Sequence, residues 1–388
     1  MTWKKLMTIY RFDQIAENIR VPVIPSNTDL DRYVGLEHLD PESLRLWRWG
    51  NPSEVIGQKL RFWKGDIIYG KRRAYQRKLA VADFDGICSA HAFVLRAKPD
   101  VCLPEFFPFF LQSELFHQRA MEISVGSLSP TINWSALAKQ EFTLPPVDEQ
   151  RRIADLLWAA DDAITEWQGT IEKLAKLLAA AREDVLCNED LPRQKLRACV
   201  KSIIAGKSVL GFGKPAAAEN EFGVLKVSAV GADGFVAEEN KLLEDDSTFI
   251  PAFSVHKDDL LITRANTREL VGRVCKVPQE YPNLMLSDKT LRLEVDETLG
   301  DKDFLLQVLR SKEARTQIEA TASGTGGAMK NISQVQILNL NLPLPELKTQ
   351  KVLAAKANEV EKTLEQTRIH LGNSFELKKQ LLNKMLSS

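Results

Sequence analysis

The feature that most constrains the fold is an internal repeat with a spacing of about 200 residues. The segment TINWSALAKQEFTLPPVDEQ (131–150) is paralleled by NISQVQILNLNLPLPELKTQ (331–350). A repeat whose parts keep their order along the chain predicts two copies of one folding unit. Four further pairs keep that order: 11–19 with 195–203, 62–73 with 254–265, 88–96 with 286–294, and 106–113 with 304–311.

Each copy consists of a mixed segment followed by a helical one. The mixed segments carry short β-prone runs bounded by Gly and Pro, and the helical pattern covers 147–186 and 346–386. Prolines end each strand-like run and are tolerated where a helix begins. We therefore expect an α+β chain. Its predicted parts are a first globular domain (1–145), a central helical spacer (146–188), a second globular domain (189–344) and a C-terminal helical spacer (345–388).

The two helical segments carry apolar residues at alternating spacings of four and three, a pattern typical of a coiled-coil seam. Acids and bases occupy the other faces. One such stripe alone would favour a helix packed on its own domain, whereas two matched stripes favour an antiparallel pair that separates the domains. The predicted seam residues are Ile153, Leu157, Ile164, Trp167, Ile171, Leu174, Leu178, Leu353, Val360, Leu364, Leu371 and Leu381.

The composition limits where the protein can act. The longest apolar runs fall well short of the roughly 18 residues that cross a bilayer, so no membrane span is expected. The N-terminus lacks the apolar core and cleavage site of a signal peptide, which predicts a cytoplasmic location. The five cysteines are scattered without a C-x-x-C pair, so we expect reduced thiols rather than a zinc site.

With these motifs in view, the chain resembles the specificity (S) subunits of type I restriction–modification systems. The resemblance covers essentially the whole chain. It rests on SPTINWSALAKQEFTLPPVDEQRRIADLL and its second copy GTGGAMKNISQVQILNLNLPLPELKTQKVLAA. The second copy has Lys348-Thr349-Gln350 where the first has Asp148-Glu149-Gln150, so only Gln350 remains of the Glu-Gln pair. The fold that this resemblance implies has two target-recognition domains alternating with two helical regions.

The resemblance also implies function and partners. It implies a non-catalytic reader of double-stranded DNA in host defence against foreign DNA, in which each domain reads one half of a bipartite, asymmetric site. The expected partners are two methyltransferase (M) subunits and two restriction/motor (R) subunits. S-adenosylmethionine, ATP and Mg are expected on those partners, and no cofactor on this chain. A helical pattern of 35–40 residues would be about 50–60 Å long, which predicts half-sites about one to two DNA turns apart.

The residues themselves show no catalytic motif. The tetrapeptide NPSE (51–54) lacks the second proline and the aromatic residue of an amino-methyltransferase, and no G-x-x-x-x-G-K-S/T occurs. The five histidines have no metal-ligand spacing, so no catalytic residue and no metal site is predicted. The glycines of SGTGGAMK (323–330) predict a flexible turn able to touch a DNA phosphate. Two alternatives stay open: a self-sufficient methyltransferase or nuclease with degenerate motifs, and a coiled-coil protein-interaction scaffold.

The strongest DNA-facing signal is a basic run between Lys59 and Lys78, where eight bases accompany one acid and aromatic residues are interleaved. Basic side chains neutralise phosphates, and arginine forks, amides and hydroxyls read base edges. A solvated cationic loop is the alternative. The predicted DNA-binding residues are Lys59, Arg61, Lys64, Lys71, Arg72, Arg73, Tyr75, Arg77 and Lys78 in the first copy, and Lys257, Arg264, Asn266, Thr267, Arg268 and Arg273 in the second.

Overall fold

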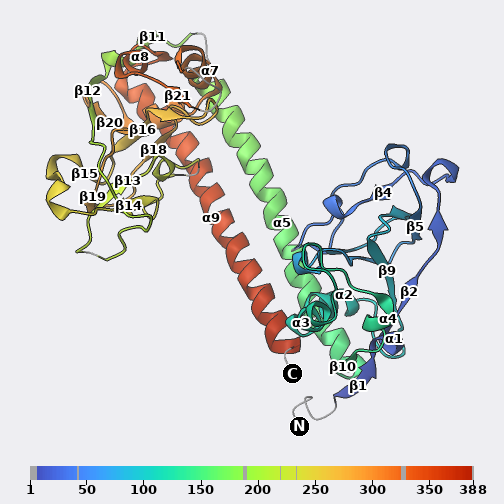
Figure 1. Ribbon diagram of the computed structural model, residues 1–388. Coiled ribbons are helices and arrows are strands. Elements are labelled where there is room, and N and C mark those ends of the chain that lie inside the picture. The colour runs from blue at the N-terminus through green and yellow to red at the C-terminus, as the bar shows by residue number, and fades with distance from the viewer. Residues whose placement is uncertain are drawn as a thin grey trace. The chain divides into compact units, whose positions relative to one another are not determined.

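Two helices of 40 residues each, α5 (Val147–Leu186) and α9 (Leu347–Leu386), lie where the sequence predicts helical segments (Figure 1). In the described part of the chain, no helix is both long and apolar enough to cross a membrane. The chain divides into two units, Met1–Gln168 with Ile369–Ser388, and Gly169–Arg368, so each unit contains part of both helices. The domain boundaries expected from the sequence remain a prediction. The structure, a computed structural model, describes residues 7–41, 43–186, 190–218, 220–232, 234–324 and 329–386.

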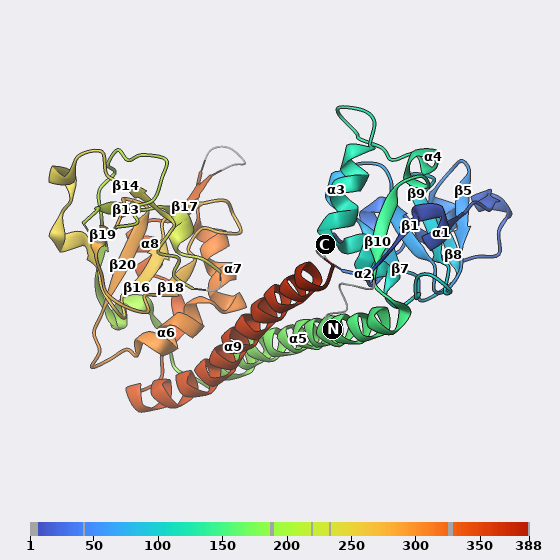
Figure 2. The ribbon, with the colours of Figure 1, turned by 90° about the horizontal axis from the view of Figure 1, so that it is seen from below.

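The first unit contains two four-stranded sheets and a short β1–β10 ribbon (Figure 2). One sheet has the order β2-β9-β6-β7 and is antiparallel. The other has the order β3-β5-β8-β4, with β4 parallel to β8. Phenylalanines of α1, α2, α3 and β10 pack ring to ring in the core beside the first sheet. The elements are β1 (Thr8–Arg11), α1 (Phe12–Ile15), β2 (Ala16–Ile19), β3 (Pro22–Val23), β4 (Tyr33–Val34), β5 (Lys59–Phe62), β6 (Ile67–Gly70), β7 (Leu79–Val81), β8 (Gly86–Cys88), β9 (Ala92–Ala97), α2 (Phe107–Gln112), α3 (Glu114–Glu122), α4 (Trp134–Leu137) and β10 (Glu141–Leu144).

The second unit repeats this topology except at one edge of the mixed sheet, where β14 pairs with β13 while β3 of the first unit pairs with β5. Its antiparallel sheet has the order β12-β20-β16-β18, its mixed sheet β14-β13-β19-β15 has β13 parallel to β19, and β11 pairs with β22 as β1 pairs with β10. The predicted α+β class and the two-copy architecture are confirmed. The elements are β11 (Arg193–Lys195), β12 (Val200–Ala205), β13 (Gly223–Leu225), β14 (Asn240–Leu242), β15 (Ser254–Val255), β16 (Leu260–Thr263), β17 (Ala265–Asn266), β18 (Val274–Lys276), β19 (Tyr281–Met285), β20 (Thr290–Val295), α6 (Lys302–Leu309), α7 (Lys312–Thr321), β21 (Lys330–Asn331), α8 (Gln334–Leu338) and β22 (Asn341–Pro343).

A buried glutamine joins the start of each long helix to its globular part. Gln150 Nε2 donates to Val101 O (2.8 Å) and Pro145 O (2.9 Å), and its Oε1 accepts from Leu103 N at 2.9 Å. Gln150 and its counterpart Gln350 in the second unit are each 1% exposed, so these hydrogen bonds satisfy backbone groups that water cannot reach.

Gln350 makes the same three contacts in the second unit. Its Nε2 donates to Leu299 O (3.0 Å) and Pro345 O (2.8 Å), and its Oε1 accepts from Asp301 N at 2.9 Å. The glutamine that survives from the Glu-Gln pair in the second copy is therefore the residue that holds the helix start.

Within each unit the two long helices run antiparallel. In the first unit, Asp161 pairs with Lys378 (Oδ1–Nζ 2.5 Å), and Trp167 stacks on His370 with ring centroids 5.3 Å apart. The residue numbers of the contacting side chains fall along α9 as they rise along α5, which is the pattern of an antiparallel pair.

The second unit shows the same antiparallel pairing. Leu178 clusters with Ala357 and Leu364, and Arg182 lies 3.7 Å from Glu361.

The predicted seam residues fall into two environments. Some belong to globular cores, and others lie between the two helices. Ile153 and Leu157 belong to the first core, Leu381 packs against it, and Leu353 packs against the second core; Ile171, Leu174, Leu178, Val360 and Leu364 form one helix–helix cluster; Ile164 is buried, and Trp167 and Leu371 are half-buried.

The described cysteines are buried and unbonded to one another. Burial raises the pKa of Cys88 and Cys275 to about 12 and that of Cys199 to about 11, and burial also raises the pKa of Cys102. These thiols therefore stay protonated at neutral pH. Cys187 lies outside the described residues.

We predict that Gln350→Met destabilises the second unit by ~3 kcal/mol, because methionine keeps the volume but leaves two carbonyls and one N–H buried without partners. The measurement is the urea midpoint followed by far-UV circular dichroism. The control is Gln366→Met on the exposed face of α9. Equal midpoints for the two variants would contradict the role given to Gln350.

Candidate nucleic-acid interface

The turn that follows β6 in the first unit is held by backbone hydrogen bonds to two other loops. Lys71 N donates to His91 O (3.1 Å), and Lys71 O accepts from Ile132 N (3.0 Å). Arg73 adopts a left-handed backbone conformation (φ 56°), and its N–H donates to Pro130 O at 2.8 Å. This frame leaves the side chains of Arg72, Arg73 and Tyr75 exposed.

Residues distant in sequence add positive charge to this turn. Burial lowers the pKa of His91, and the positive charges of Arg72, Lys71 and Lys59 lower it further. The Arg72 Nη1 and His91 Nε2 atoms are 3.4 Å apart. Burial likewise lowers the pKa of Lys71, followed by the charge of Arg20. We call Arg20, Lys59, Lys71, Arg72 and His91 the first basic patch.

Three of the four remaining predicted residues of the run contact other parts of the protein. Arg77 Nη2 donates to Glu114 Oε2 (2.5 Å), and Lys78 Nζ donates to Leu36 O (2.8 Å). Arg61 lies over the Trp63 ring, with its guanidinium carbon 5.0 Å from the centroid. Lys64 is exposed next to them. The run therefore has three parts: a turn whose side chains are exposed, a set of basic residues that contact other parts of the protein, and Lys64, which is exposed outside the turn.

The second unit has the same frame with different side chains. Arg264 N donates to Lys289 O (2.8 Å), and Arg264 O accepts from Ile332 N (2.9 Å), so Arg264 corresponds to Lys71 and Lys289 to His91. Arg264 and Lys289 are both exposed, and with Lys330 on the neighbouring strand β21 they form the second basic patch. The Lys330 Nζ atom lies 3.3 Å from Gly324 O.

Sequence reasoning missed Arg20, His91, Lys289 and Lys330 as members of the patches. The aligned segments 88–96 and 286–294 place His91 opposite Lys289. This correspondence in the repeat is the sequence feature from which both residues could have been predicted. Arg20 gave no signal, because its neighbour Lys71 is 51 positions along the chain.

The other predicted residues of the second unit are not members of this patch. Lys257 is exposed, with its backbone N–H donating to Glu280 (3.2 Å). Asn266 Oδ1 accepts from Thr267 N at 2.8 Å. Arg268 lies 3.5 Å from Glu319 in an ion pair, and Arg273 lines a pocket that includes the start of α7. Gly326 and Gly327 of the glycine-rich turn lie outside the described residues.

Both patches offer charged and polar groups that can bind phosphates and bases. Across the residues that the structure describes, no group of three or more His, Cys, Asp or Glu side chains is placed to hold a metal ion. Lysine and arginine charges can neutralise phosphates, and the exposed Arg, Tyr and Thr side chains and the half-buried Asn266 can donate to base edges.

Three curated relatives share part of this sequence. The chain is 29% identical over 176 residues to the type I restriction enzyme EcoEI specificity subunit of Escherichia coli, covering 45% of this chain and 30% of that protein. It is 30% identical over 166 residues to the EcoDI specificity subunit of the same species, covering 39% and 35%. It is 23% identical over 284 residues to the MjaVIII specificity subunit of Methanocaldococcus jannaschii, covering 68% of this chain and 65% of that protein. The chain thus spans about a third of the length of the first two relatives.

Solved structures share the fold. One chain, from a structure of complex assembly and conformational transition of the type I R-M system, matches with a TM-score of 0.57 and 18% identity, covering 98% of this chain and 97% of that chain. The type I restriction-modification S subunit from M. genitalium matches with a TM-score of 0.64 and 14% identity, covering 98% and 96%. The sequence model described as "Type I restriction modification DNA specificity domain" matches residues 10–176 and 220–371. The chain therefore belongs to the family of type I restriction–modification DNA specificity domains.

Proposed function

We propose that this chain is the sequence-specific DNA-recognition subunit of a type I restriction–modification complex. The observation that carries the proposal is the repeated backbone frame, which presents a basic turn at Lys71 in one unit and at Arg264 in the other. A reader of a bipartite site needs two surfaces of this kind, because phosphate contacts set the register on DNA and side chains on the same surface read the bases.

The side chains on the two frames favour unlike half-sites. The first turn offers Arg72 and Arg73, and arginine forks pair with guanine in the major groove. The second turn offers Asn266 and Thr267, and asparagine pairs with adenine. A chain that uses both turns would read an asymmetric site.

The proposed role makes the chain a non-catalytic subunit. Two M subunits would supply S-adenosylmethionine-dependent methylation, and two R subunits would supply ATP- and Mg-dependent cleavage, in the cytoplasm. The pseudo-repeat supports two copies of each partner, since equal folds can offer equal docking surfaces.

The function is tested by co-expression with a methyltransferase subunit and mapping of methylated bases in host DNA. We expect two short, unlike half-sites separated by a gap of fixed length, and no modification by the purified chain alone. A single continuous motif would contradict the bipartite role. Methylation or cleavage by the chain alone would identify it as a self-sufficient enzyme instead.

We predict that Arg72→Ala and Arg73→Ala each weaken binding to the mapped site. The loss should be about 1–3 kcal/mol where the arginine reads a base, and smaller with a shallower salt slope where it meets a phosphate. Affinity is measured at several salt concentrations. Arg119→Ala on α3 is the control, because its side chain pairs with Glu122 outside the patch. A double variant with unchanged affinity and salt slope would exclude this turn from the interface.

We predict that DNA binding by the first unit strengthens as the pH falls from 7.5 to about 6. His91 is neutral in the free chain at pH 7.5, since burial and neighbouring cations hold its pKa below the ordinary value. A nearby phosphate would favour the imidazolium, so the complex would bind more protons than the free chain. Each unit by which DNA raises this pKa is worth up to about tenfold in affinity.

The pH effect is measured as the binding constant against pH for wild type and His91→Gln. His117→Gln is the matched control, because burial also lowers the pKa of His117 while the residue lies on α3, outside the patch. The slope should disappear in His91→Gln alone, and persistence of the slope in that variant would place His91 away from DNA.

We predict that the long helices set the gap between the half-sites. Inserting seven residues after Gly169 and seven after Gly372 adds one heptad to α5 and one to α9, which keeps the seam pattern while adding ~10 Å. Both glycines have open space around them. The mapped gap should lengthen by about three base pairs. A heptad in α5 alone should reduce methylation, and an unchanged gap in the double insertion would show that the helices do not act as a ruler.

A further inference from the structure

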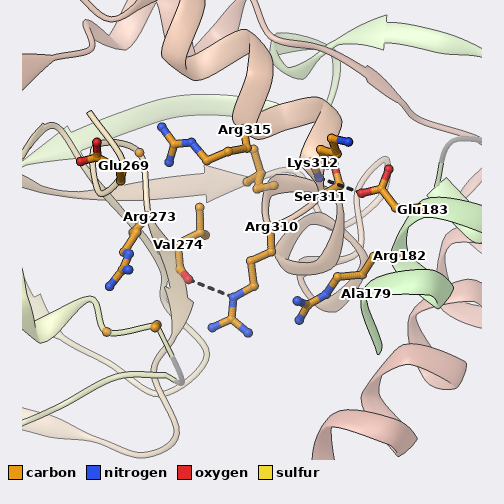
Figure 3. A pocket seen from close by; sticks show the side chains of 14 residues that line it. Ala179, Arg182, Glu183, Glu269, Arg273, Val274, Arg310, Ser311, Lys312 and Arg315 are labelled. Carbon is orange, nitrogen blue, oxygen red and sulfur yellow. Dashed lines mark hydrogen bonds between the residues drawn. The ribbon is translucent and has the colours of Figure 1, made fainter. Parts of the chain in front are cut away.

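A pocket of about 570 Å³ in the second unit lies where α5, the loop before β18 and the start of α7 come together (Figure 3). Its volume falls in the range typical of small-molecule sites. Two acids, Glu183 and Glu269, accompany the bases on its wall. The bases are Arg182, Arg273, Arg310, Lys312 and Arg315.

Two of these bases share one carboxylate. Arg310 Nη1 lies 2.5 Å from Glu361 Oε1, and Arg182 Nη2 lies 3.7 Å from the same atom. Burial lowers the pKa of Arg182, and the charge of Arg310 lowers it further while Glu361 opposes both effects. One negative charge therefore faces two guanidinium groups.

The other two arginines differ from each other in their compensation. Arg315 Nε is buried and has no hydrogen-bond partner among the described residues, although Glu319 Oε1 lies 3.1 Å away as an ion pair. No described residue forms an ion pair with Arg273. Burial lowers the pKa of Arg315, and the positive charge of Arg273 contributes to that lowering. Two guanidinium groups that repel each other thus line an open space.

The first unit has a pocket at the matching place, of about 200 Å³. Ser113 and Ser311 cap α3 and α7 in the same way, each accepting from the N–H three residues later. The described lining of the smaller pocket contains no lysine or arginine.

The aligned residues explain this difference. The first unit has Gln112, Glu114 and His117 where the second has Arg310, Lys312 and Arg315, and it has Leu382 where the second has Arg182. The fold forms this pocket without the cations, so their presence in the second unit requires a separate explanation.

We propose that the pocket in the second unit binds a phosphate group. The five bases of the wall outnumber its two acids and the paired carboxylates Glu361 and Glu319 taken together, and a phosphate monoester brings about two negative charges and three acceptor oxygens. Guanidinium forks match this geometry in a bidentate manner. A carboxylate has one charge and two oxygens, and the wall already holds two such groups. The phosphate comes from a free nucleotide or from the DNA backbone.

The test uses the double variant Arg273→Gln/Arg315→Gln in the full chain. Neither change orphans a carboxylate, because Glu319 keeps Arg268 at 3.5 Å and no described carboxylate pairs with Arg273. Arg315→Gln alone is included because Arg273 is also a predicted DNA contact. Arg119→Gln, an exposed arginine of the first unit, is the control, and circular dichroism verifies folding of all variants.

In the first arm, pyrophosphate and adenosine diphosphate are titrated calorimetrically. Wild type and Arg119→Gln should bind them saturably, and the double variant at least tenfold more weakly. This arm requires no DNA binding, so it can succeed even if the proposed recognition function fails.

In the second arm, duplex DNA is titrated at several salt concentrations. If free phosphates do not bind but Arg315→Gln lowers DNA affinity and reduces the salt slope by about one, the pocket takes a backbone phosphate. If the double variant equals wild type in both arms, the proposal is overturned.

Discussion

The structure depends on a buried amide at the point where each strand-like run becomes a long helix. A helix start leaves backbone groups unpaired, and here the chain arrives through prolines that cannot donate. Gln150 and Gln350 tie this junction to the globular part, because each donates to the carbonyl of Pro145 or Pro345 and accepts from the N–H of a loop residue. The start of each long helix is therefore fixed against the core of its own unit.

A fixed frame with replaceable side chains is the physical basis of the proposed recognition. The hydrogen bonds that hold Lys71 and Arg264 involve only backbone atoms, so the fold is indifferent to the side chains these turns present. The first unit shows the limit of this freedom, because Arg77 and Lys78 are engaged by Glu114 and Leu36 O.

The sequence predicted what depends on local pattern. The repeat, the α+β class and the two helices could be predicted because periodicity and proline placement are local signals. The make-up of the first basic patch could not, because Arg20 and His91 reach Lys71 only through tertiary pairing of distant strands. The same limit applies to basic residues near Lys78, since a charge count does not reveal which of them find partners inside the protein. The sequence marked Gln350 as the remnant of a motif, but it did not predict that this side chain is buried.

The two copies also differ in how they neutralise one acid on each long helix. Asp161 and Glu361 occupy matching positions, and each faces two cations. Asp161 forms ion pairs with Lys378 of α9 and Arg45 of a loop. Glu361 forms ion pairs with Arg182 of α5 and with Arg310 at the end of α6. A half-buried or buried carboxylate needs positive charge nearby, but the element that supplies it is free to change. In the second unit that choice places two arginines on the wall of the pocket, so a stabilising contact of the helix pair also contributes to the field that an incoming anion would meet.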